Sequence, residues 1–327
     1  MKKNIAIVMG GYSSEHDISI KSGNIVYAHL SKEIYTTFRI VVTKNEWYYW
    51  DDSDAKIPVD RSNFTISLNE ETIAFDAVFN TIHGTPGEDG LLQAYFELLT
   101  IPQTSCNHYT AAVTFNKRDC ISILKAYHIP VAENYFINKN QPINIDEITS
   151  KVGLPCFVKA NRSGSSFGVV KAHTKEAIAP ALKEAFTVDN EVIIESFLSG
   201  TEISVGVACF NGTPTVLGIT EIVTENDFFD YEAKYLGKSE EITPARLTTE
   251  QNKEVEALTL EVYKALNMKG FSRTDFIFNN GKPYFLEINT NPGLSEASIL
   301  PQQSIKKGIS LAELFANEVE ECLKLHF

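Results

Sequence analysis

Short apolar runs alternate with amphipathic stretches over the first hundred residues of the chain. The predicted strands cover residues 4–11, 38–43 and 75–84, and the predicted helices cover residues 13–30 and 91–99. Ser14 and Asp17 form a candidate capping box at the start of the first helix. This β-α-β alternation predicts a parallel sheet with helices on its faces. Ligands bind at the carboxyl ends of such strands, where the pairs Gly10-Gly11 and His83-Gly84 lie.

From about residue 101 the pattern changes to hairpins and longer helices, so the class becomes α+β in this part of an otherwise α/β chain. The predicted helices cover residues 116–130, 251–268 and 311–325, and strand-loop-strand units cover residues 153–172, 191–210 and 272–290. Linkers near residues 100 and 195 predict three parts. These are an N-terminal domain (1–104), a central lobe (105–195) and a C-terminal lobe (196–327).

Composition is that of an ordinary globular protein, with 43% hydrophobic and 22% charged residues among 327. The formal net charge of -13 argues against a nucleic-acid or anionic-membrane partner, and any bound anion needs a local cluster of lysines and arginines. No apolar run reaches the roughly 18 residues that span a bilayer, and no signal peptide is recognised. Five scattered cysteines without C-x-x-C spacing are expected to be reduced, which favours a cytoplasmic protein.

The segments "SRTDFIF" and "KPYFLEIN" flank Asn280-Gly281, which marks a hairpin turn. With a three-residue loop, Asp275 lies opposite Glu287 and Arg273 lies opposite Asn289, all on one face. A two-residue loop would send Asp275 to the other face. Two carboxylates and an amide oxygen on one face suit Mg²⁺. The alternative is a cross-strand ion pair with Arg273 on a solvated face.

The segment "FVKANRSGSSFGVVK" is a glycine-serine loop between two predicted strands, with Lys159 in the first of them. It lacks the order of a Walker A loop, and a strand follows it rather than a helix. Backbone N–H groups in such a loop can approach phosphate oxygens. An ordinary mobile hairpin tip is the competing interpretation.

Two further segments offer candidate ligand contacts. Glu195 ends an apolar strand and Glu202 follows seven residues later, which suits contacts to an adenine and a ribose; simple surface exposure is the alternative. The aromatic loop "NDFFDYEAKY" contains Lys234 and Tyr235 and is long enough to be a lid that excludes water.

Six segments in a fixed order carry a resemblance to a known family. They are "GGYSSEHDIS", "HGTPGEDG", "FVKANRSGSSFGV", "YEAKY", "SRTDF" and "EINTNPG". Together they resemble the ATP-grasp enzymes, and most closely the D-alanine–D-alanine ligases, over essentially the whole chain. The resemblance implies an ATP-grasp fold, in which an N-terminal parallel-sheet domain precedes two lobes that clamp ATP. Two segments depart from the usual pattern: "KANRSGSS" replaces a lysine-proline start, and "PGLSEAS" varies the final loop.

The resemblance also implies roles at the nucleotide and the metal. The implied nucleotide contacts are Lys117 and Lys159 at the phosphates, Gly164, Ser165 and Ser166 in the loop that covers them, Glu195 at the adenine, Glu202 at the ribose and Lys234 at the γ-phosphate. The implied ligands of two Mg²⁺ ions, for which Mn²⁺ could substitute, are Asp275, Asn289 and a bridging Glu287.

For the substrates, the resemblance implies that Glu15, Ser165 and Tyr235 form a hydrogen-bonded set around the first D-alanine. Arg273 and the N–H of Gly293 would stabilise the tetrahedral oxyanion. The residues implied near the substrate carboxylates are His83 and Ser298.

The implied reaction joins two D-alanine molecules through a D-alanyl phosphate, for synthesis of peptidoglycan precursors by a homodimeric enzyme. Tyr235 favours D-alanine as the acceptor, because phenylalanine at this place goes with D-lactate ligases in the family. A D-alanine–D-lactate or different dipeptide ligase is the near alternative. A regulatory nucleotide-binding module without catalysis is the distant one, and it should have lost Arg273 or a metal ligand, all of which are present.

Overall fold

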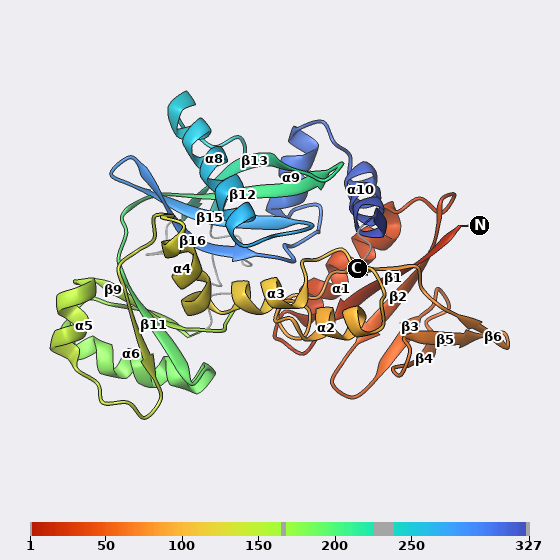
Figure 1. The fold of residues 1–327 in the computed structure, drawn as a ribbon, viewed down its shortest axis with the longest axis horizontal. Helices are drawn as coiled ribbons and strands as arrows, with labels where there is room; N and C mark the ends of the chain where they lie inside the picture. The colour runs from red at the N-terminus through yellow and green to blue at the C-terminus, as the bar shows by residue number, and fades with distance from the viewer. Residues whose placement is uncertain (1, 165–167, 225–238, 325–327) are drawn as a thin grey trace.

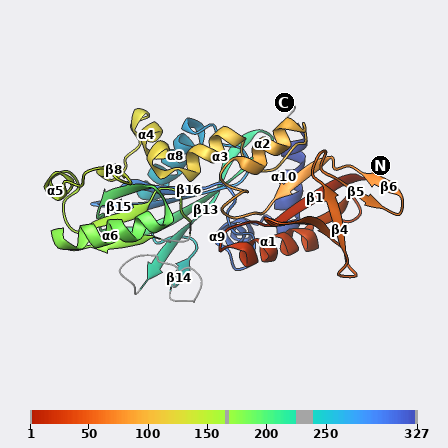
Figure 2. The same cartoon turned by 90° about the horizontal axis from the view of Figure 1, so that it is seen from below.

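Three sheets organise the computed structural model, which describes residues 2–164, 168–224 and 239–324. The N-terminal sheet has the strand order β6-β5-β4-β3-β2-β1-β7, the central sheet β10-β9-β11-β8, and the C-terminal sheet β14-β13-β12-β15-β16. Figures 1 and 2 show the N-terminal and central sheets at opposite ends of the molecule, with the C-terminal sheet between them.

The strands of the N-terminal sheet are β1 (Lys3–Gly10), β2 (Tyr35–Val42), β3 (Trp47–Trp50), β4 (Lys56–Asp60), β5 (Thr65–Leu68), β6 (Glu71–Ile73) and β7 (Ala77–Asn80). Those of the central sheet are β8 (Asn134–Asn138), β9 (Cys156–Ala160), β10 (Val169–Ala172) and β11 (Glu191–Ser196). Those of the C-terminal sheet are β12 (Gly200–Phe210), β13 (Thr213–Thr224), β14 (Ser239–Ile242), β15 (Ser272–Asn279) and β16 (Lys282–Asn289).

The helices cover the faces of these sheets. They are α1 (His16–His29), α2 (Leu91–Leu98), α3 (His108–Phe115), α4 (Lys117–Ala126), α5 (Ile145–Val152), α6 (Lys175–Val188), α8 (Thr249–Ala265), α9 (Ile299–Lys306) and α10 (Leu311–Lys324). The long helices predicted from apolar spacing are therefore confirmed as α1, α4, α8 and α10.

The parallel core of the N-terminal sheet is confirmed, since β1 pairs in parallel with both β2 and β7. Alternate β1 residues enter two different cores, one with α1 and α10 and one with α2, which explains why the whole run is apolar. The strands β3 to β6 extend this sheet in antiparallel fashion and were not predicted, because each is only three to five residues long. The capping box predicted at Ser14 is wrong: Glu15 precedes α1 and no side chain caps it.

The strands β15 and β16 pair as predicted, but the hairpin loop does not have the length on which that prediction depended. Asp275 lies opposite Glu287 and Arg273 opposite Asn289. The loop holds two residues and not three, since Asn279 pairs with Lys282, and Asn280 and Gly281 both have positive φ as a type I′ turn requires. A β-bulge between the Asp275 and Phe276 pairs, with Leu286 as the extra residue, restores the register.

Helix α10, near the end of the sequence, packs against both the N-terminal domain and the C-terminal lobe. It packs against α1, β7 and β12, and its residues Leu314, Phe315 and Val319 belong to a core that also contains Ile5 and Phe79. The N-terminal domain and the C-terminal lobe therefore share one hydrophobic core, while the central sheet has a core of its own with α5 and α6.

The cysteine prediction is confirmed, as all five thiols are free. Among the described residues, no helix has both the length and the apolar character needed to cross a bilayer.

Glu318 is a buried acid on the inner face of α10, with only 1% of its surface exposed. Burial raises the pKa of its carboxyl well above the ordinary value, and the nearby charge of Glu321 adds to this, although the N–H of Phe271 bonds to it. Its Oε2 has no hydrogen-bond partner among the described residues. The carboxyl of Glu318 is therefore harder to ionise in the folded protein than in the unfolded chain.

We predict that Glu318→Gln stabilises the protein relative to the wild type, by an amount that grows as the pH rises. The pKa of Glu318 is higher in the folded than in the unfolded protein. The wild-type carboxyl therefore contributes most to folding stability below its unfolded-state pKa, and this contribution is lost as the pH rises towards the folded-state pKa. The variant's advantage over the wild type should grow as the pH rises above about 5, by up to about 1.4 kcal/mol per pH unit. Urea unfolding at several pH values measures it. The control is Glu313→Gln, since hydrogen bonds from Ser310 lower the pKa of Glu313 and its effect should be constant above pH 5. Parallel curves for the wild type and Glu318→Gln would contradict the assignment.

Candidate active site

Two adjoining clefts gather the predicted site residues. The first, of about 470 Å³, lies between the central and C-terminal sheets, and the second, of about 450 Å³, faces the N-terminal domain. The predicted residues that line the first cleft are Lys117, Lys159, Glu195, Glu202, Asp275 and Glu287. Those that line the second are Glu15, His83, Gly164, Arg273, Asn289, Gly293 and Ser298. Ser165, Ser166, Lys234 and Tyr235 lie outside the described residues.

The boundary between the clefts is formed by Lys117, Ser163 and Glu287, which line both. A ligand in the first cleft and a ligand in the second therefore meet beside one lysine and one carboxylate. This arrangement suits the transfer of a charged group between two bound molecules, because it brings the reactants together without diffusion.

The acidic face of the β15–β16 hairpin points into these clefts. Asp275 is 7% exposed, accepts a hydrogen bond of 2.6 Å from Ser204 Oγ, and is bound bidentately by Arg273 at 3.1 and 3.0 Å. The predicted alternative, a cross-strand pair on a solvated face, is wrong on both counts, since this ion pair runs along β15 and is largely buried.

The oxygen atoms of this face fit a magnesium site. Asn289 lies beside Asp275, since its Nδ2 donates to Asp275 Oδ2 at 3.4 Å, and Glu287 lies directly opposite Asp275. Within the described residues no group of three or more His, Cys, Asp or Glu side chains has metal-binding spacing. The set of two carboxylates and one amide is thus incomplete by itself, as is usual where phosphate oxygens supply the remaining ligands of Mg²⁺.

Lys159 is held beside the same face by an ion pair of 2.6 Å with Glu195. Burial lowers the pKa of this lysine, but the charges of Glu195, Glu287 and Glu202 outweigh burial and leave the pKa raised. Lys159 therefore stays cationic. Glu195 is 7% exposed, so the alternative of simple surface exposure is wrong for it. The predicted contact of Glu195 with an adenine stays a prediction.

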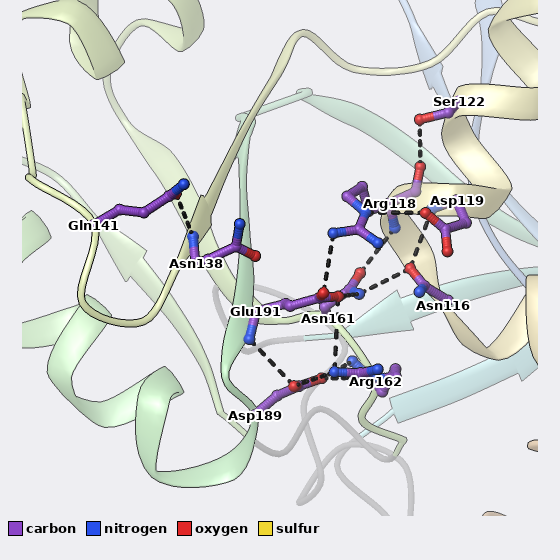
Figure 3. A network of polar contacts seen from close by, with 10 residues as sticks. All are labelled: Asn116, Arg118, Asp119, Ser122, Asn138, Gln141, Asn161, Arg162, Asp189 and Glu191. Carbon is purple, nitrogen blue, oxygen red and sulfur yellow. Dashed lines mark hydrogen bonds and ion pairs between the residues drawn. The ribbon is translucent and has the colours of Figure 1, made fainter.

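A polar network fixes the start of the glycine-serine loop (Figure 3). Arg162 binds Asp189 through Nε and Nη2 at 3.0 and 2.8 Å, and its backbone N–H bonds to the same carboxylate. Asn161 donates to Asn116 Oδ1 and to Glu191 Oε2, both at 2.8 Å. Asn161 and Arg162, which lie within the departing segment "KANRSGSS", thus tie this loop to the start of α4, the end of α6 and β11.

Lys117 adds a further link to the same loop. It is the first residue of α4, and its Nζ donates to the carbonyl oxygen of Ser163 at 2.6 Å. The lysine expected at the phosphates therefore also orders the loop expected to cover them.

The N-terminal domain supplies the other wall. Glu15 lies against the glycine-serine loop, because a Cβ added to Gly164 would sit 3.0 Å from its Oε2. Across the cleft, a Cβ on Gly293 would sit 2.8 Å from Ser298 Oγ, so these two predicted residues are neighbours. The contacts expected of Glu15 and Ser298 with substrates stay predictions.

Two residues of the "HGTPGEDG" loop lock onto the turn after β16. His83 Nδ1 lies 2.7 Å from the carbonyl oxygen of Asn291, and burial lowers the pKa of its ring, so His83 is neutral. Glu88 was not predicted; it accepts from the N–H groups of Gly84 at 2.6 Å and Asn291 at 3.2 Å. Burial and the charge of Glu15 raise the pKa of Glu88 to about 8. The only sign of this role of Glu88 in the sequence was the presence of an acidic residue in a glycine-rich loop.

Comparisons with known proteins agree with this geometry. The sequence profile described as "D-ala D-ala ligase N-terminus" matches residues 4–106, and that described as "D-ala D-ala ligase C-terminus" matches residues 123–320. The D-alanine--D-alanine ligase of Christiangramia forsetii is 60% identical over 323 residues, or 99% of each chain. This chain belongs to the D-alanine–D-alanine ligase family.

Solved structures of D-alanine–D-alanine ligase relatives share the whole fold. The VanG D-Ala:D-Ser ligase from Enterococcus faecalis has a TM-score of 0.89 at 30% identity, covering 98% of this chain and 100% of its own. The D-alanine--D-alanine ligase from Bacillus anthracis complexed with ATP has a TM-score of 0.78 at 29% identity and covers 98% of each chain. The predicted ATP-grasp fold, with a parallel-containing N-terminal sheet, is confirmed.

We predict that Arg162→Ala weakens nucleotide binding in this member of the D-alanine–D-alanine ligase family. A partly exposed ion pair is worth about 1 kcal/mol, so KM for ATP should rise about fivefold while KM for the amino acid is unchanged. Arg162→Lys should recover only part of the loss, because it cannot bind Asp189 bidentately.

The control for this variant is Lys175→Ala, which breaks the exposed pair of Lys175 with Asp146 in the same lobe. An unaltered KM for ATP in Arg162→Ala would mean that the network stabilises the lobe without holding the loop.

Proposed function

We propose that this protein joins two D-alanine molecules to D-alanyl-D-alanine at the expense of ATP, as a step in peptidoglycan precursor synthesis. The proposal rests chiefly on the shared boundary of the two clefts at Lys117, Ser163 and Glu287. A terminal phosphate in the first cleft and a carboxylate in the second would meet there. The names of the relatives support the same reaction.

In the first step, the carboxylate of one D-alanine attacks the γ-phosphorus of ATP, forming an acyl phosphate and ADP. Lys117 and Lys159 neutralise phosphate charge, and the glycine-serine loop covers it. Asp275, Glu287 and Asn289 would hold the Mg²⁺ ions, which would supply neutralisation of the charge that phosphoryl transfer develops. A carboxylate alone has a poor leaving group, and the acyl phosphate supplies a good one.

In the second step, the amine of the other D-alanine attacks the acyl carbon and phosphate leaves. Negative charge develops on the carbonyl oxygen, where preorganised donors lower the barrier most. Arg273 and the backbone N–H of Gly293 are the donors in the second cleft. Glu15, together with Ser165 and Tyr235, orients the first D-alanine.

The three-part organisation at 1–104, 105–195 and 196–327 remains our proposal for how these tasks are divided. The N-terminal part binds amino acid, the central part covers the phosphates, and the C-terminal part holds the metal and the oxyanion donors. A homodimer is likewise a proposal, which the molar mass in solution tests.

The substrate panel tests the reaction itself. Phosphate release and product are measured with ATP, Mg²⁺ and D-alanine alone, then with D-alanine plus D-lactate or D-serine, since one structural relative is named a D-Ala:D-Ser ligase. We expect turnover with D-alanine alone and a dipeptide as the main product. Tyr235→Phe should move the product ratio towards the depsipeptide. Absence of turnover with D-alanine alone at neutral pH would refute the proposed function.

We predict that Glu287→Gln abolishes turnover while the fold is retained. Metal-assisted charge stabilisation is worth several kcal/mol, so the rate should fall more than about 100-fold. The unfolding midpoint should change little. The control is Glu296→Gln, which removes one exposed carboxylate from the segment that follows β16. Normal activity in Glu287→Gln would exclude this residue as a metal ligand.

A further inference from the structure

The turn that follows β16 carries Gly293, the proposed backbone donor to the oxyanion. A single N–H group is a useful catalytic donor only when its direction is fixed, and Gly293 has no side chain with which to fix it. The hydrogen bonds that flank Gly293 lead to the N-terminal domain, although the turn belongs to the C-terminal lobe.

Asn291 provides the first of these links. Its Nδ2 donates to the carbonyl oxygens of Gly87 at 2.7 Å and Ile82 at 3.2 Å, and its backbone N–H donates to Glu88 at 3.2 Å. The residue is 6% exposed. An amide side chain that is buried and bonded to two carbonyl groups of another domain holds the two domains together at this point, and its removal leaves the pairing of β16, which ends at Asn289, in place.

Ser22 and His83 provide the second link. The carbonyl oxygen of Asn291 can only accept, so His83 Nδ1 carries the proton and Nε2 accepts from Ser22 Oγ at 3.2 Å. Ser22 Oγ in turn accepts from the N–H of Leu294 at 3.2 Å. Gly293 is thereby held on both sides, at residues 291 and 294, by one continuous set of hydrogen bonds.

We propose that Asn291 is a positioning residue for the second step of the reaction, and that Ser22 supports it from the other side of the turn. Together they aim the Gly293 N–H at the reacting carbonyl by docking the turn on the N-terminal domain. The inference rests on the proposed function and adds to it a role for residues outside the sets assigned to substrate, nucleotide and metal.

The Asn291 side chain can be removed without unfolding the loop to which it bonds. The carbonyl oxygen of Gly87 also accepts from Asn80 Nδ2 at 2.9 Å and from Gln93 Nε2. In Asn291→Ala this carbonyl keeps two donors, so the loop retains its internal bonds. The variant therefore separates positioning from folding.

The decisive readout is the ratio of phosphate released to dipeptide formed. If the Gly293 N–H is misdirected, the acyl phosphate still forms, but its reaction with the amine is slower. Water then attacks the phosphorus of the acyl phosphate, the bond between phosphorus and the acyl oxygen breaks, and D-alanine and inorganic phosphate are released without use of the oxyanion donors. A loss of folded enzyme lowers both products equally and leaves the ratio at one.

For Asn291→Ala we expect dipeptide formation to fall by about 10- to 100-fold, as small misplacements of reacting groups do. The phosphate-to-dipeptide ratio should rise above one, with KM for ATP unchanged within about twofold. Ser22→Ala should act in the same direction and provides a second test if Asn291→Ala folds poorly. The control is Asn317→Ala, which removes a single amide-to-carbonyl bond of 2.6 Å between α10 and Cys209 of β12.

Ratios of one in both variants would overturn the positioning role, whether or not total activity falls. Failure of the wild-type protein to form dipeptide from D-alanine would instead refute the proposed function. The two failures are thus distinguishable in one assay.

Discussion

The hydrogen-bond register of β15 against β16 is the constraint on which the active site depends. A two-residue turn alone would pair Asp275 with Leu286 and place the carboxylate of Glu287 on the core face of the sheet, because side chains alternate along β16. The bulge at Leu286 moves Asp275 opposite Glu287 and leaves Phe276 opposite Phe285. These two rings are buried and meet edge to face with centroids 6.2 Å apart, so slipping the register would cost an aromatic contact in the core as well as the acidic face.

That acidic face explains how an acidic protein can present cations to an anion. Lys159 and Arg273 would be expensive to bury alone, and each is paired with a carboxylate, Glu195 and Asp275 respectively. The pairs order long side chains before any ligand arrives. Phosphate binding then requires an exchange of partners and not the ordering of mobile lysines, which keeps the entropic cost of binding low. The net charge of -13 is irrelevant at this range, because the site is governed by its nearest charges.

The sequence allowed the prediction of features that depend on local pattern. The helices and the gathering of strand ends around one site follow from periodicity and sheet topology. The pairing of Asp275 with Glu287 was expected only for a three-residue hairpin loop, and this condition was wrong, since a bulge leaves no signal in the pattern of apolar residues. The strands β3 to β6 were missed because they are too short to show alternation. Asn291, Ser22 and Glu88 were missed because their partners are distant in sequence: Asn291 and Gly87 are separated by 204 positions.

The same long-range contacts indicate which parts of the molecule act as one body. The N-terminal domain and the C-terminal lobe share a core around α10 and are joined again at Asn291, so separating them would expose apolar surface and break buried hydrogen bonds. The central sheet has its own core with α5 and α6, and it meets the C-terminal sheet across the cleft lined by Lys159 and Glu287. Ile193 of β11 and Leu124 of α4 also belong to a further core that they share with Val205 and Phe276 of the C-terminal sheet. The C-terminal sheet therefore shares a core with each of its neighbours, and a movement that widens the cleft for a nucleotide must keep the core around Ile193 and Phe276 in place or expose its apolar surface to water.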